Sequence, residues 1–319
     1  AKLESRVSKE AKIADVSSGV GRFLVAYVEV VRELLQASNS SKTVLQSYLA
    51  KAISNITAID IDYLALDIAR LCVYEASGYK QLPESSSFVL ANPLLDCGGG
   101  DTVARMISFS LFDFYNQSLG IRTSQFEDSF DLIIGNPPWE KIRLEEKSFF
   151  ITLVSSHIRI DGKRERLKAI SVMGEKAPQL YEHYTNVYSS YQNAKVLVKK
   201  SQYFQKSSKG ELNTYSLFAE LSLALVSQPG LVAILVKSGI LTTAVNKAIL
   251  QKLVRDQVLF RVADYVNSRK IFAIDGRERF CLLVLSSHKK KSFLYSGLNT
   301  NINDVENSQL YWAYPYSAL

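Results

Sequence analysis

The sequence predicts an α/β fold built on a doubly wound, mostly parallel sheet, and three observations support this prediction. Short apolar segments bounded by turn residues alternate with segments whose apolar positions recur at helical spacing. A glycine turn at residues 17–21 directly follows the first apolar segment. The chain has 319 residues, of which 47% are hydrophobic, so it can bury the core of one large or two ordinary domains.

The first part of the chain contains most of the expected strands and helices. We expect strands at residues 12–16, 56–61, 106–112 and 130–134 and helices at residues 22–36, 43–54 and 65–75. Residues 78–102 are rich in proline, glycine and serine and predict an irregular loop. Because strands alternate with helices, we expect helices on both faces of the sheet.

The second part begins with a basic, mostly helical insertion. Residues 141–210 hold fourteen Lys and Arg against six Asp and Glu, whereas the whole chain has a net charge of +7. A helix at residues 213–226 and strands at residues 231–236, 258–265 and 279–286 are expected after it. The chain thus divides into a first half at 1–145, a basic helical insertion at 146–212, a second half of the sheet at 213–286, and residues 287–319, a C-terminal tail or the beginning of a further domain.

Two interpretations of the basic insertion stay open. A basic block beside a nearly neutral body suggests a surface that faces a polyanion, with Lys163, Arg164 and Arg166 as candidate phosphate contacts. The alternative is a solvated helical face with surplus lysine. The tyrosines at positions 181, 184, 188 and 191 favour the packed face of a helix over a base-stacking platform.

Composition also argues against several classes of protein. No run of about 18 uninterrupted apolar residues is present, so no membrane span is expected, and residues 1–14 lack the features of a secretory signal. The three cysteines lie far apart and the chain has only three histidines, which argues against a disulfide framework or a metal site. We therefore expect a protein of the reducing cytoplasm.

The glycine turn indicates a site for a nucleoside. Asp15, Ser17, Gly19 and Gly21 lie at the end of the first expected strand, where open α/β sheets bind ligands. A dinucleotide fingerprint needs a third small residue, but Leu24 stands at that position, so a ligand without phosphates fits better. A purely structural turn is the alternative.

An acidic residue ends the second expected strand. A carboxylate at the position of Asp60 can accept both hydroxyl hydrogens of a ribose. Its separation from Gly21 is longer than the roughly 20 residues of a compact nucleotide-binding unit, because an extra helix intervenes. The alternative is that Asp60 or Asp62 caps the helix that follows.

The tetrapeptide Asn136-Pro137-Pro138-Trp139 follows the strand expected at residues 130–134. Proline has no backbone N–H, so the local carbonyl groups are left as acceptors beside the Asn136 side-chain oxygen. Such a group can hold an amine through two accepted hydrogen bonds while the Trp139 ring stacks on a flat ring attached to that amine. A structural turn is the alternative.

Several segments resemble motifs of a known enzyme family. The resemblance to motif IV of the S-adenosylmethionine-dependent amino methyltransferases rests on Phe-Asp-Leu-Ile-Ile-Gly-Asn-Pro-Pro-Trp at residues 130–139. Residues 15–24 then resemble motif I and residues 58–62 motif II, in the order of the γ-group N6-adenine DNA methyltransferases. The segments 210–218, 230–241 and 267–272 are similar to the large methylases of type IIG restriction-modification and phage-exclusion systems. The resemblance covers residues 12–286 and implies a Rossmann-like methyltransferase fold.

The resemblance also implies a cofactor site for S-adenosylmethionine. Asp15 would face the ammonium group of the cofactor and Asp60 its ribose. The acidic residue near its adenine would be Asp113, with Asp101 as the alternative. The remaining implied cofactor contacts are Ser17, Gly19, Gly21, Phe23 and Ile61.

The activity implied is transfer of a methyl group to N6 of an adenine flipped out of double-stranded DNA. Asn136 and the Pro137 carbonyl would accept the two amine hydrogens, with Pro138 completing the turn. Trp139 and Phe272 would sandwich the base, and an ordinary core role is the alternative for Phe272.

Two rival functions stay open. One is methylation of another planar amine or amide, in RNA or in a protein, and the other is a methyltransferase fold that only binds DNA or a partner subunit. We expect the helix that precedes motif I in the family, a target-recognition domain and any nuclease to lie outside this chain. The complete protein would belong to a prokaryotic restriction-modification or phage-defence system.

Overall fold

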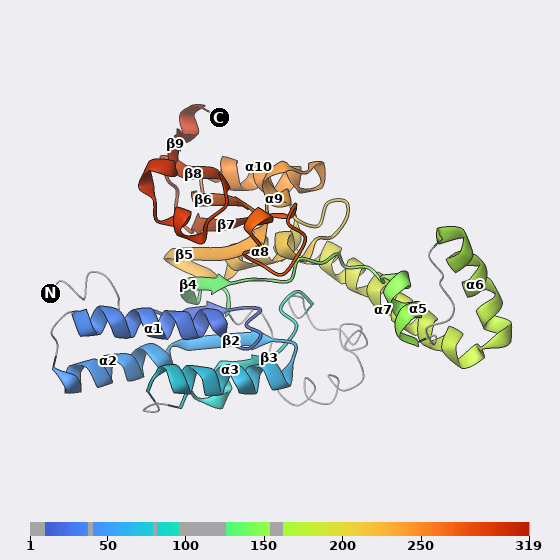
Figure 1. The fold of residues 1–319 in the computed structure, drawn as a ribbon, viewed down its shortest axis with the longest axis horizontal. Helices are drawn as coiled ribbons and strands as arrows, with labels where there is room; N and C mark the ends of the chain where they lie inside the picture. Colours follow the sequence, from blue (N-terminus) through green and yellow to red (C-terminus); the bar gives the residue numbers. More distant parts are fainter. Residues whose placement is uncertain (1–9, 38–40, 79–81, 96–125, 154–161, 319) are drawn as a thin grey trace.

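The computed structural model describes residues 10–37, 41–78, 82–95, 126–153 and 162–318 (Figure 1). Within these residues, nine strands form one sheet in the order β3-β2-β1-β4-β5-β7-β6-β8-β9. The strands are β1 (Ile13–Asp15), β2 (Ile56–Asp60), β3 (Phe88–Leu90), β4 (Phe130–Gly135), β5 (Val226–Lys237), β6 (Leu259–Val266), β7 (Arg279–Ser286), β8 (Ser292–Asn299) and β9 (Trp312–Pro315). The strand expected at residues 106–112 and the candidates Asp101 and Asp113 lie outside the described residues.

The sheet reverses its direction of growth between β1 and β4. The chain proceeds from β1 outward through β2 to β3 and then returns to β4 and β5 on the other side of β1, all in parallel orientation. Strand β7 lies between β5 and β6 and is antiparallel to both. The prediction of a doubly wound, mostly parallel sheet is therefore confirmed, and its reversal point is where such sheets bind ligands.

Helices cover both faces of the sheet. Side chains alternate between the two faces along each strand, so both faces carry apolar side chains that helices can bury. On one face, α1 (Arg22–Ala37), α2 (Lys42–Ser54) and α3 (Tyr63–Ala76) bury a cluster that includes Ile56 and Ala58 of β2. On the other face, α8 (Thr214–Leu225) and α10 (Lys247–Arg255) bury a second cluster that includes Ile59 of the same strand. None of the helices in the described ranges is both long and apolar enough to cross a bilayer.

Two segments differ from the sequence-based expectation. The loop expected at residues 78–102 contains β3, a three-residue strand that is recognisable only by its parallel pairing with β2. Residues 287–319 were expected to be a tail or the beginning of another domain. They add β8 and β9 to the same sheet, with β8 parallel to β6 and β9 antiparallel to β8.

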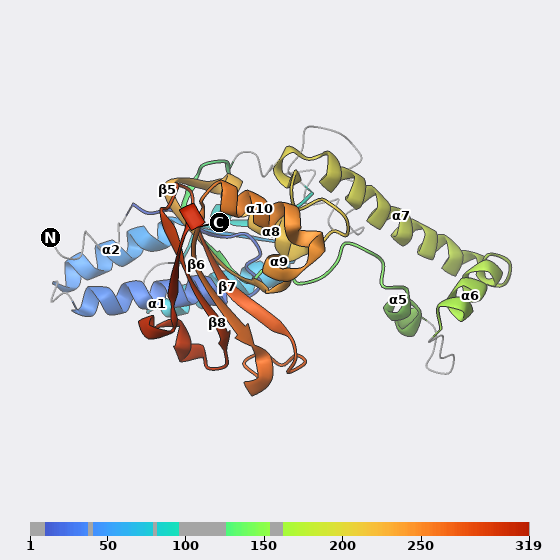
Figure 2. The ribbon, with the colours of Figure 1, turned by 90° about the horizontal axis from the view of Figure 1, so that it is seen from above.

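The basic insertion projects from the body as an arm (Figures 1 and 2). It consists of α5 (Glu146–Leu153), α6 (Lys163–Lys176) and α7 (Pro178–Lys200), which we call the basic arm. Met173 of α6 and Tyr184 of α7 form a small apolar cluster of its own, with partly buried neighbours such as Phe149 of α5. The arm therefore packs mainly on itself, and α7 leads back to the body.

Candidate active site

The carboxyl ends of β1, β2 and β4 meet at one edge of the sheet because the three strands are parallel neighbours. Asp15 ends β1, Asp60 ends β2 and Gly135 ends β4. Residues that the sequence analysis placed in three separate motifs thus lie together at the reversal point of the sheet.

The glycine turn is held against the end of β2. The Ser18 amide donates to the Ile59 carbonyl, and the Gly19 amide donates to Asp60 Oδ2 at 2.8 Å. Gly19 has a φ of +50°, and a Cβ atom placed on it would meet nothing within 4 Å. The space in front of Gly19 is therefore open to a ligand.

Gly21 serves a different purpose in the same turn. Its φ is +77°, and a Cβ atom placed on it would lie 2.8 Å from Ala69 Cβ of α3. The two helices that follow β1 and β2 can approach each other only because this side chain is missing. For Gly21, the structure supports a packing role.

Asp15 is 1% exposed, and one of its carboxylate oxygens has no hydrogen bond to any residue that the structure describes. Oδ1 accepts from the Ser17 amide at 3.0 Å, while Oδ2 is the unpartnered atom. Burial raises the pKa of Asp15 to about 7, the Ser17 amide offsets part of this rise, and the negative charge of Asp60 adds to it. A buried carboxylate with a free oxygen is well suited to a cationic donor from a ligand.

Gly135 allows the two halves of the site to touch. A Cβ atom at this position would lie only 2.5 Å from Asp15 Oδ1, and Gly135 has a φ of +157°. Any other residue would force the Asp15 carboxylate away from the end of β4. Asp15 and the tetrapeptide are therefore adjacent because residue 135 is glycine.

The two acidic residues after β2 have separate roles. Asp62 Oδ1 accepts from the Leu64 and Ala65 amides and so caps α3. Asp60 does not cap the helix, because its oxygens accept from the Gly19 and Asp62 amides. The capping alternative therefore applies to Asp62 and not to Asp60.

Three other predicted cofactor contacts surround this edge. Ser17 lies in the turn and is half-buried, Phe23 is half-buried near the start of α1, and Ile61 is 51% exposed just beyond β2. Their positions at one edge agree with a shared site, and their contacts with a cofactor stay predictions.

The acceptor edge of the tetrapeptide is open. Asn136 is exposed, and within the described chain its side-chain amide makes no hydrogen bond, nor does the Pro137 carbonyl accept one. The next carbonyl, of Pro138, accepts from Thr214 Oγ1 at 2.5 Å, and the same hydroxyl oxygen accepts from the Glu140 amide at 3.0 Å. Thr214 thus fixes the far side of the turn, and within the described residues the exposed Asn136 amide and the carbonyl of the buried Pro137 stay unengaged.

Trp139 is half-buried in an aromatic cluster. Its Nε1 donates to the Leu235 carbonyl at 3.3 Å, and its ring stacks on Phe280 with centroids 6.0 Å apart. Phe272 meets Trp139 at 5.8 Å with an angle of 79° between the rings, which is edge-to-face contact. Because the two rings touch and are nearly perpendicular, the expected sandwich of a base between them does not exist in this structure.

The loop that carries Phe272 is organised by Asn267, which is fully buried. Its Nδ2 donates to the carbonyls of Phe272 at 3.0 Å and Asp275 at 3.2 Å, and its Oδ1 accepts from the Phe272 amide at 2.9 Å. One side chain thus holds both backbone groups of Phe272. The position of the aromatic ring beside Trp139 depends on this residue.

The three predicted phosphate contacts lie on α6 of the basic arm. Lys163 begins the helix and Arg164 is exposed. Arg166, however, is only 18% exposed, and its Nε lies 3.5 Å from a carboxylate oxygen of Glu146. This guanidinium is turned inward and helps to hold α5 and α6 together, and its contact with a phosphate stays a prediction.

The four tyrosines do not form a single face. Tyr184 is buried and donates to Glu146 at 3.2 Å, as the packed-face interpretation requires. Tyr181 and Tyr188 are 39% and 44% exposed, and Tyr191 is half-buried. The packed-face interpretation therefore holds for Tyr184 but not for its exposed neighbours.

Sequence reasoning missed Gly135, Thr214 and Asn267. Gly135 was part of the quoted motif, but its contact with Asp15 joins residues far apart in the chain. Thr214 follows Asn213, a typical helix start, which gave no sign of a bond to residues 76 positions away. Asn267 begins the segment 267–272 that resembles the large methylases, but nothing in the sequence showed that its side chain holds the backbone of Phe272.

Comparison with known proteins found similar structures but no similar sequences among protein families or curated proteins. A scan against protein-family models and a search of curated proteins found no match to this sequence. The chain resembles the type ISP restriction-modification enzyme LlaBIII, solved bound to DNA, with 13% identity and a TM-score of 0.58 over 96% of this chain and 20% of that chain. A nuclease-deletion mutant of the type ISP enzyme LlaGI, in complex with a DNA substrate mimic, gives 16% identity and a TM-score of 0.57 over 96% and 24%. A modification subunit assigned to a type I restriction enzyme from Vibrio vulnificus gives 14% identity and a TM-score of 0.53 over 97% and 51%.

These likenesses define the fold of the chain. It is a Rossmann-like, doubly wound α/β fold of the methyltransferase type, as the motif resemblance implied. The chain spans only 20% to 51% of the length of the three solved chains, which therefore contain further domains.

Proposed function

We propose that this chain is the catalytic core of an S-adenosylmethionine-dependent DNA methyltransferase that modifies N6 of adenine. The observation that carries the proposal is that a buried carboxylate with an unpartnered oxygen and an exposed amide lie at one sheet edge. Asp15 presents a buried, unpartnered oxygen at the end of β1, and Asn136 presents an exposed, unpartnered amide just after the adjacent β4. A buried oxygen without a partner is unfavourable in the folded chain, and the ammonium group of a cofactor would satisfy it, while the exposed Asn136 amide is accessible to a target amine.

The residues at this edge fit S-adenosylmethionine. Asp15 Oδ2 would accept from the ammonium group, and the positive charge would lower the pKa of Asp15 and keep it ionised. Each Asp60 oxygen accepts one amide and has lone-pair capacity left for a ribose hydroxyl. The cofactor, when bound, supplies a methyl group on a sulfonium centre.

Asn136 and Pro137 would orient the amine that receives the methyl group. The Asn136 side-chain oxygen and the Pro137 carbonyl would each accept one hydrogen of the exocyclic amine. This arrangement would turn the nitrogen lone pair out of conjugation with the ring. The Pro138 carbonyl would not compete with Asn136 and Pro137 for the amine hydrogens, because the Thr214 hydroxyl already donates to it.

Adenine N6 is paired inside a duplex, so the proposed target is an extruded base. Stacking on Trp139 would require its edge contact with Phe272 to open. Base-aromatic stacking is worth roughly 1 to 3 kcal/mol, which exceeds the roughly 0.5 to 1.5 kcal/mol of an aromatic pair. The rearrangement is therefore energetically accessible.

The wider setting of the protein is also part of the proposal. Three of the similar structures are restriction-modification proteins, and two of them were solved with DNA or a DNA mimic. We therefore place the complete protein in a cytoplasmic restriction-modification or phage-defence system, with double-stranded DNA as partner and a target-recognition domain elsewhere in the protein.

A methyl-transfer assay tests the proposal. The full-length protein would be incubated with duplex DNA and S-adenosylmethionine that carries a labelled methyl group, and the nucleosides would be separated by mass spectrometry. We expect N6-methyladenine as the labelled product. Label in cytosine, RNA or protein would overturn the proposed substrate. Binding of DNA without binding of cofactor would instead identify a non-catalytic module.

A further inference from the structure

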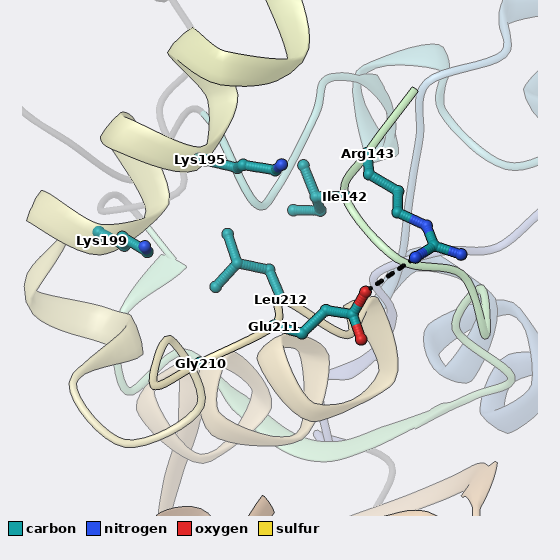
Figure 3. A pocket seen from close by; sticks show the side chains of 7 residues that line it. All are labelled: Ile142, Arg143, Lys195, Lys199, Gly210, Glu211 and Leu212. Atoms are coloured by element: carbon teal, nitrogen blue, oxygen red, sulfur yellow. Dashed lines mark hydrogen bonds and ion pairs between the residues drawn. The ribbon is translucent and has the colours of Figure 1, made fainter. Parts of the chain in front are cut away.

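The two ends of the basic arm meet the body at a narrow neck, formed by residues 138–143 and 210–214. The Ile142 amide donates to the Leu212 carbonyl and the Thr214 amide donates to the Glu140 carbonyl, so the two segments pair like a short piece of sheet. A cavity of about 150 Å³ lies between this neck and the last turns of α7 (Figure 3).

Two lysines of α7 line this cavity, the half-buried Lys195 and the exposed Lys199. Lys195 and Lys199 are one helical turn apart, and Figure 3 shows both side chains pointing from α7 toward the neck. Within the described residues, neither ammonium group has a carboxylate within ion-pair distance. Two like charges at this spacing repel each other by a few tenths of a kcal/mol in the absence of a counter-charge.

The carboxylate of the cavity is already engaged. Glu211 lies 2.7 Å from Lys141 Nζ and 3.1 Å from Arg143 Nη1. The hydrogen bond from Lys141 and the charges of Arg143 and Lys195 hold the pKa of Glu211 below its usual range. Arg143 is held on its other side by Glu145 at 2.6 Å. The neck is thus charge-balanced, and the unbalanced charge of the cavity belongs to Lys195 and Lys199.

The cavity is connected to the tetrapeptide through short segments and a hydrogen bond. Its wall begins at Ile142, three residues after Trp139, and Thr214 Oγ1 bonds the Pro138 carbonyl on the neighbouring segment. An anion held between α7 and the neck would therefore have a fixed position relative to Asn136. The cavity is much smaller than the roughly 300 to 1,000 Å³ of typical small-molecule sites, so it suits one tetrahedral anionic group rather than a whole nucleotide.

We propose that Lys195 and Lys199, with the neck opposite them, form a binding site for one backbone phosphodiester of duplex DNA. This inference rests on the proposed function and adds to it the contact that sets the register of the DNA relative to Asn136. Phosphate contacts by lysine position a nucleic acid without reading its sequence. In this proposal the main phosphate contact lies at the base of α7. The sequence-based expectation had placed it on α6, at the far end of the arm. Helix α7 has 23 residues and so is about 35 Å long, which keeps the two regions apart.

Lysine footprinting on the full-length protein tests the site without requiring catalysis. The protein would be treated with an amine-acetylating reagent, with and without duplex DNA, and modification would be measured by mass spectrometry. We expect DNA to slow acetylation of Lys195 and Lys199 at least several-fold, with little change at the exposed Lys168 and Lys176 of α6. Inorganic phosphate at the same phosphate concentration should protect neither pair.

Each outcome of the footprint has a definite meaning. Protection of Lys168 and Lys176 without Lys195 and Lys199 overturns the inference but leaves DNA binding intact. Protection of Lys195 and Lys199 by duplex RNA and not by duplex DNA overturns it in favour of an RNA partner. No protection anywhere means that the chain does not bind duplex DNA, and the proposed function falls together with the inference.

Matched double variants supply a second measurement. Binding of DNA weakens with salt by a log–log slope of about 0.9 for each phosphate neutralised. Lys195→Gln/Lys199→Gln should reduce this slope by about 1. Lys168→Gln/Lys176→Gln removes the same charge from the far end of the arm and should leave the slope unchanged. Equal reductions in both variants would show a diffuse basic surface in place of a site.

Discussion

Polar side chains at the sheet edge formed by β1, β2 and β4 differ from those on the basic arm in whether they have partners. At the sheet edge, Asp15 is buried and keeps an oxygen without a partner. On the arm, the inward-turned Arg166 is paired with Glu146, and Arg164 is exposed to water. An unsatisfied buried group costs roughly 1 to 3 kcal/mol, whereas a solvated charge costs almost nothing.

This difference shows where a structure reveals function. The buried, unpartnered oxygen of Asp15 at the sheet edge indicates a missing ligand, because folding alone does not favour it. Charge density on the arm indicates very little by itself, since solvated and paired charges are compatible with any function. At the base of α7, Lys195 and Lys199 line a cavity, and within the described residues no carboxylate lies within ion-pair distance of either, so the charge there is placed as well as dense.

The largest effect is expected at Asn136. Asn136→Ala should reduce methyl transfer by at least roughly 100-fold, by analogy with the loss of one preorganised group from a catalytic site. Stability to thermal unfolding should change by less than about 0.5 kcal/mol, because the side chain is exposed and unbonded. The assay is transfer of labelled methyl groups to duplex DNA by the full-length protein. Asn193→Ala, at an exposed position on α7, is the matched control.

A near-parental transfer rate in Asn136→Ala would mean that the tetrapeptide is a structural turn. A large loss of stability in the same variant would also contradict this account, because it would show that the side chain has a partner in the fold.

The next effect concerns the affinity of Asp15 for the cofactor. An ionised Asp15 is needed to bind an ammonium group, and its pKa is about 7. Affinity for S-adenosylhomocysteine should therefore rise by up to about tenfold per pH unit below that value and level off above it. Asp15→Asn should weaken binding by roughly 10- to 100-fold and remove this part of the pH dependence. Calorimetry at a series of pH values measures both, and an unchanged pH profile in the variant would contradict the assignment.

The same carboxylate should affect stability in the absence of cofactor. Folding raises the pKa of Asp15 from 3.8 to about 7, so the native state holds the proton more tightly than the unfolded state. Its contribution to stability is present below the unfolded pKa and is lost as pH rises to the folded pKa. The advantage of Asp15→Asn over the parent should grow with pH and become constant above about pH 7. Urea unfolding at several pH values measures this difference.

Substitution of Trp139 should lower both the stability of the fold and the rate of methyl transfer. Trp139→Ala removes contacts with Phe280 and Phe272 and should cost about 2 to 4 kcal/mol of stability as well as most of the activity. Trp139→Phe loses the bond to the Leu235 carbonyl, should cost about 1 kcal/mol and should retain partial activity. Trp312→Ala, at a 71% exposed position, is the control in the same unfolding assay. Equal stability of Trp139→Ala and the parent would place Trp139 outside the core.

The smallest effect is expected on the arm. Arg166→Gln breaks the pair with Glu146 and should destabilise the packing of α5 and α6 by about 1 kcal/mol. Arg164→Gln, at an exposed position two residues away, should change nothing measurable. Hydrogen exchange of the arm amides compares the two variants. Equal protection in both would show that Arg166 does not hold α5 and α6 together.

Local patterns explain why most of the site could be predicted. A glycine turn after an apolar strand, an acid at the end of the next strand and an Asn-Pro-Pro-Trp turn are each contained in a few neighbouring residues. The structure brings Asp15, Asp60 and Asn136 to one edge because the three strands are parallel neighbours. The edge-to-face contact of Phe272 with Trp139 was not predictable, because ring orientation depends on the loop that Asn267 holds.

The sequence by itself determined the alternation of strands and helices, the doubly wound class and the motif residues. These follow from periodicity and turn chemistry, which act between neighbours in the chain. Only the tertiary structure decided the order of the strands, the pairing of β3, β8 and β9, and the approach of Asp15 to Gly135. It also turned Arg166 inward and pointed Lys195 and Lys199 into a cavity. The physical reason is that each of these features joins segments distant in the chain, and packing rather than local preference selects which distant segments meet.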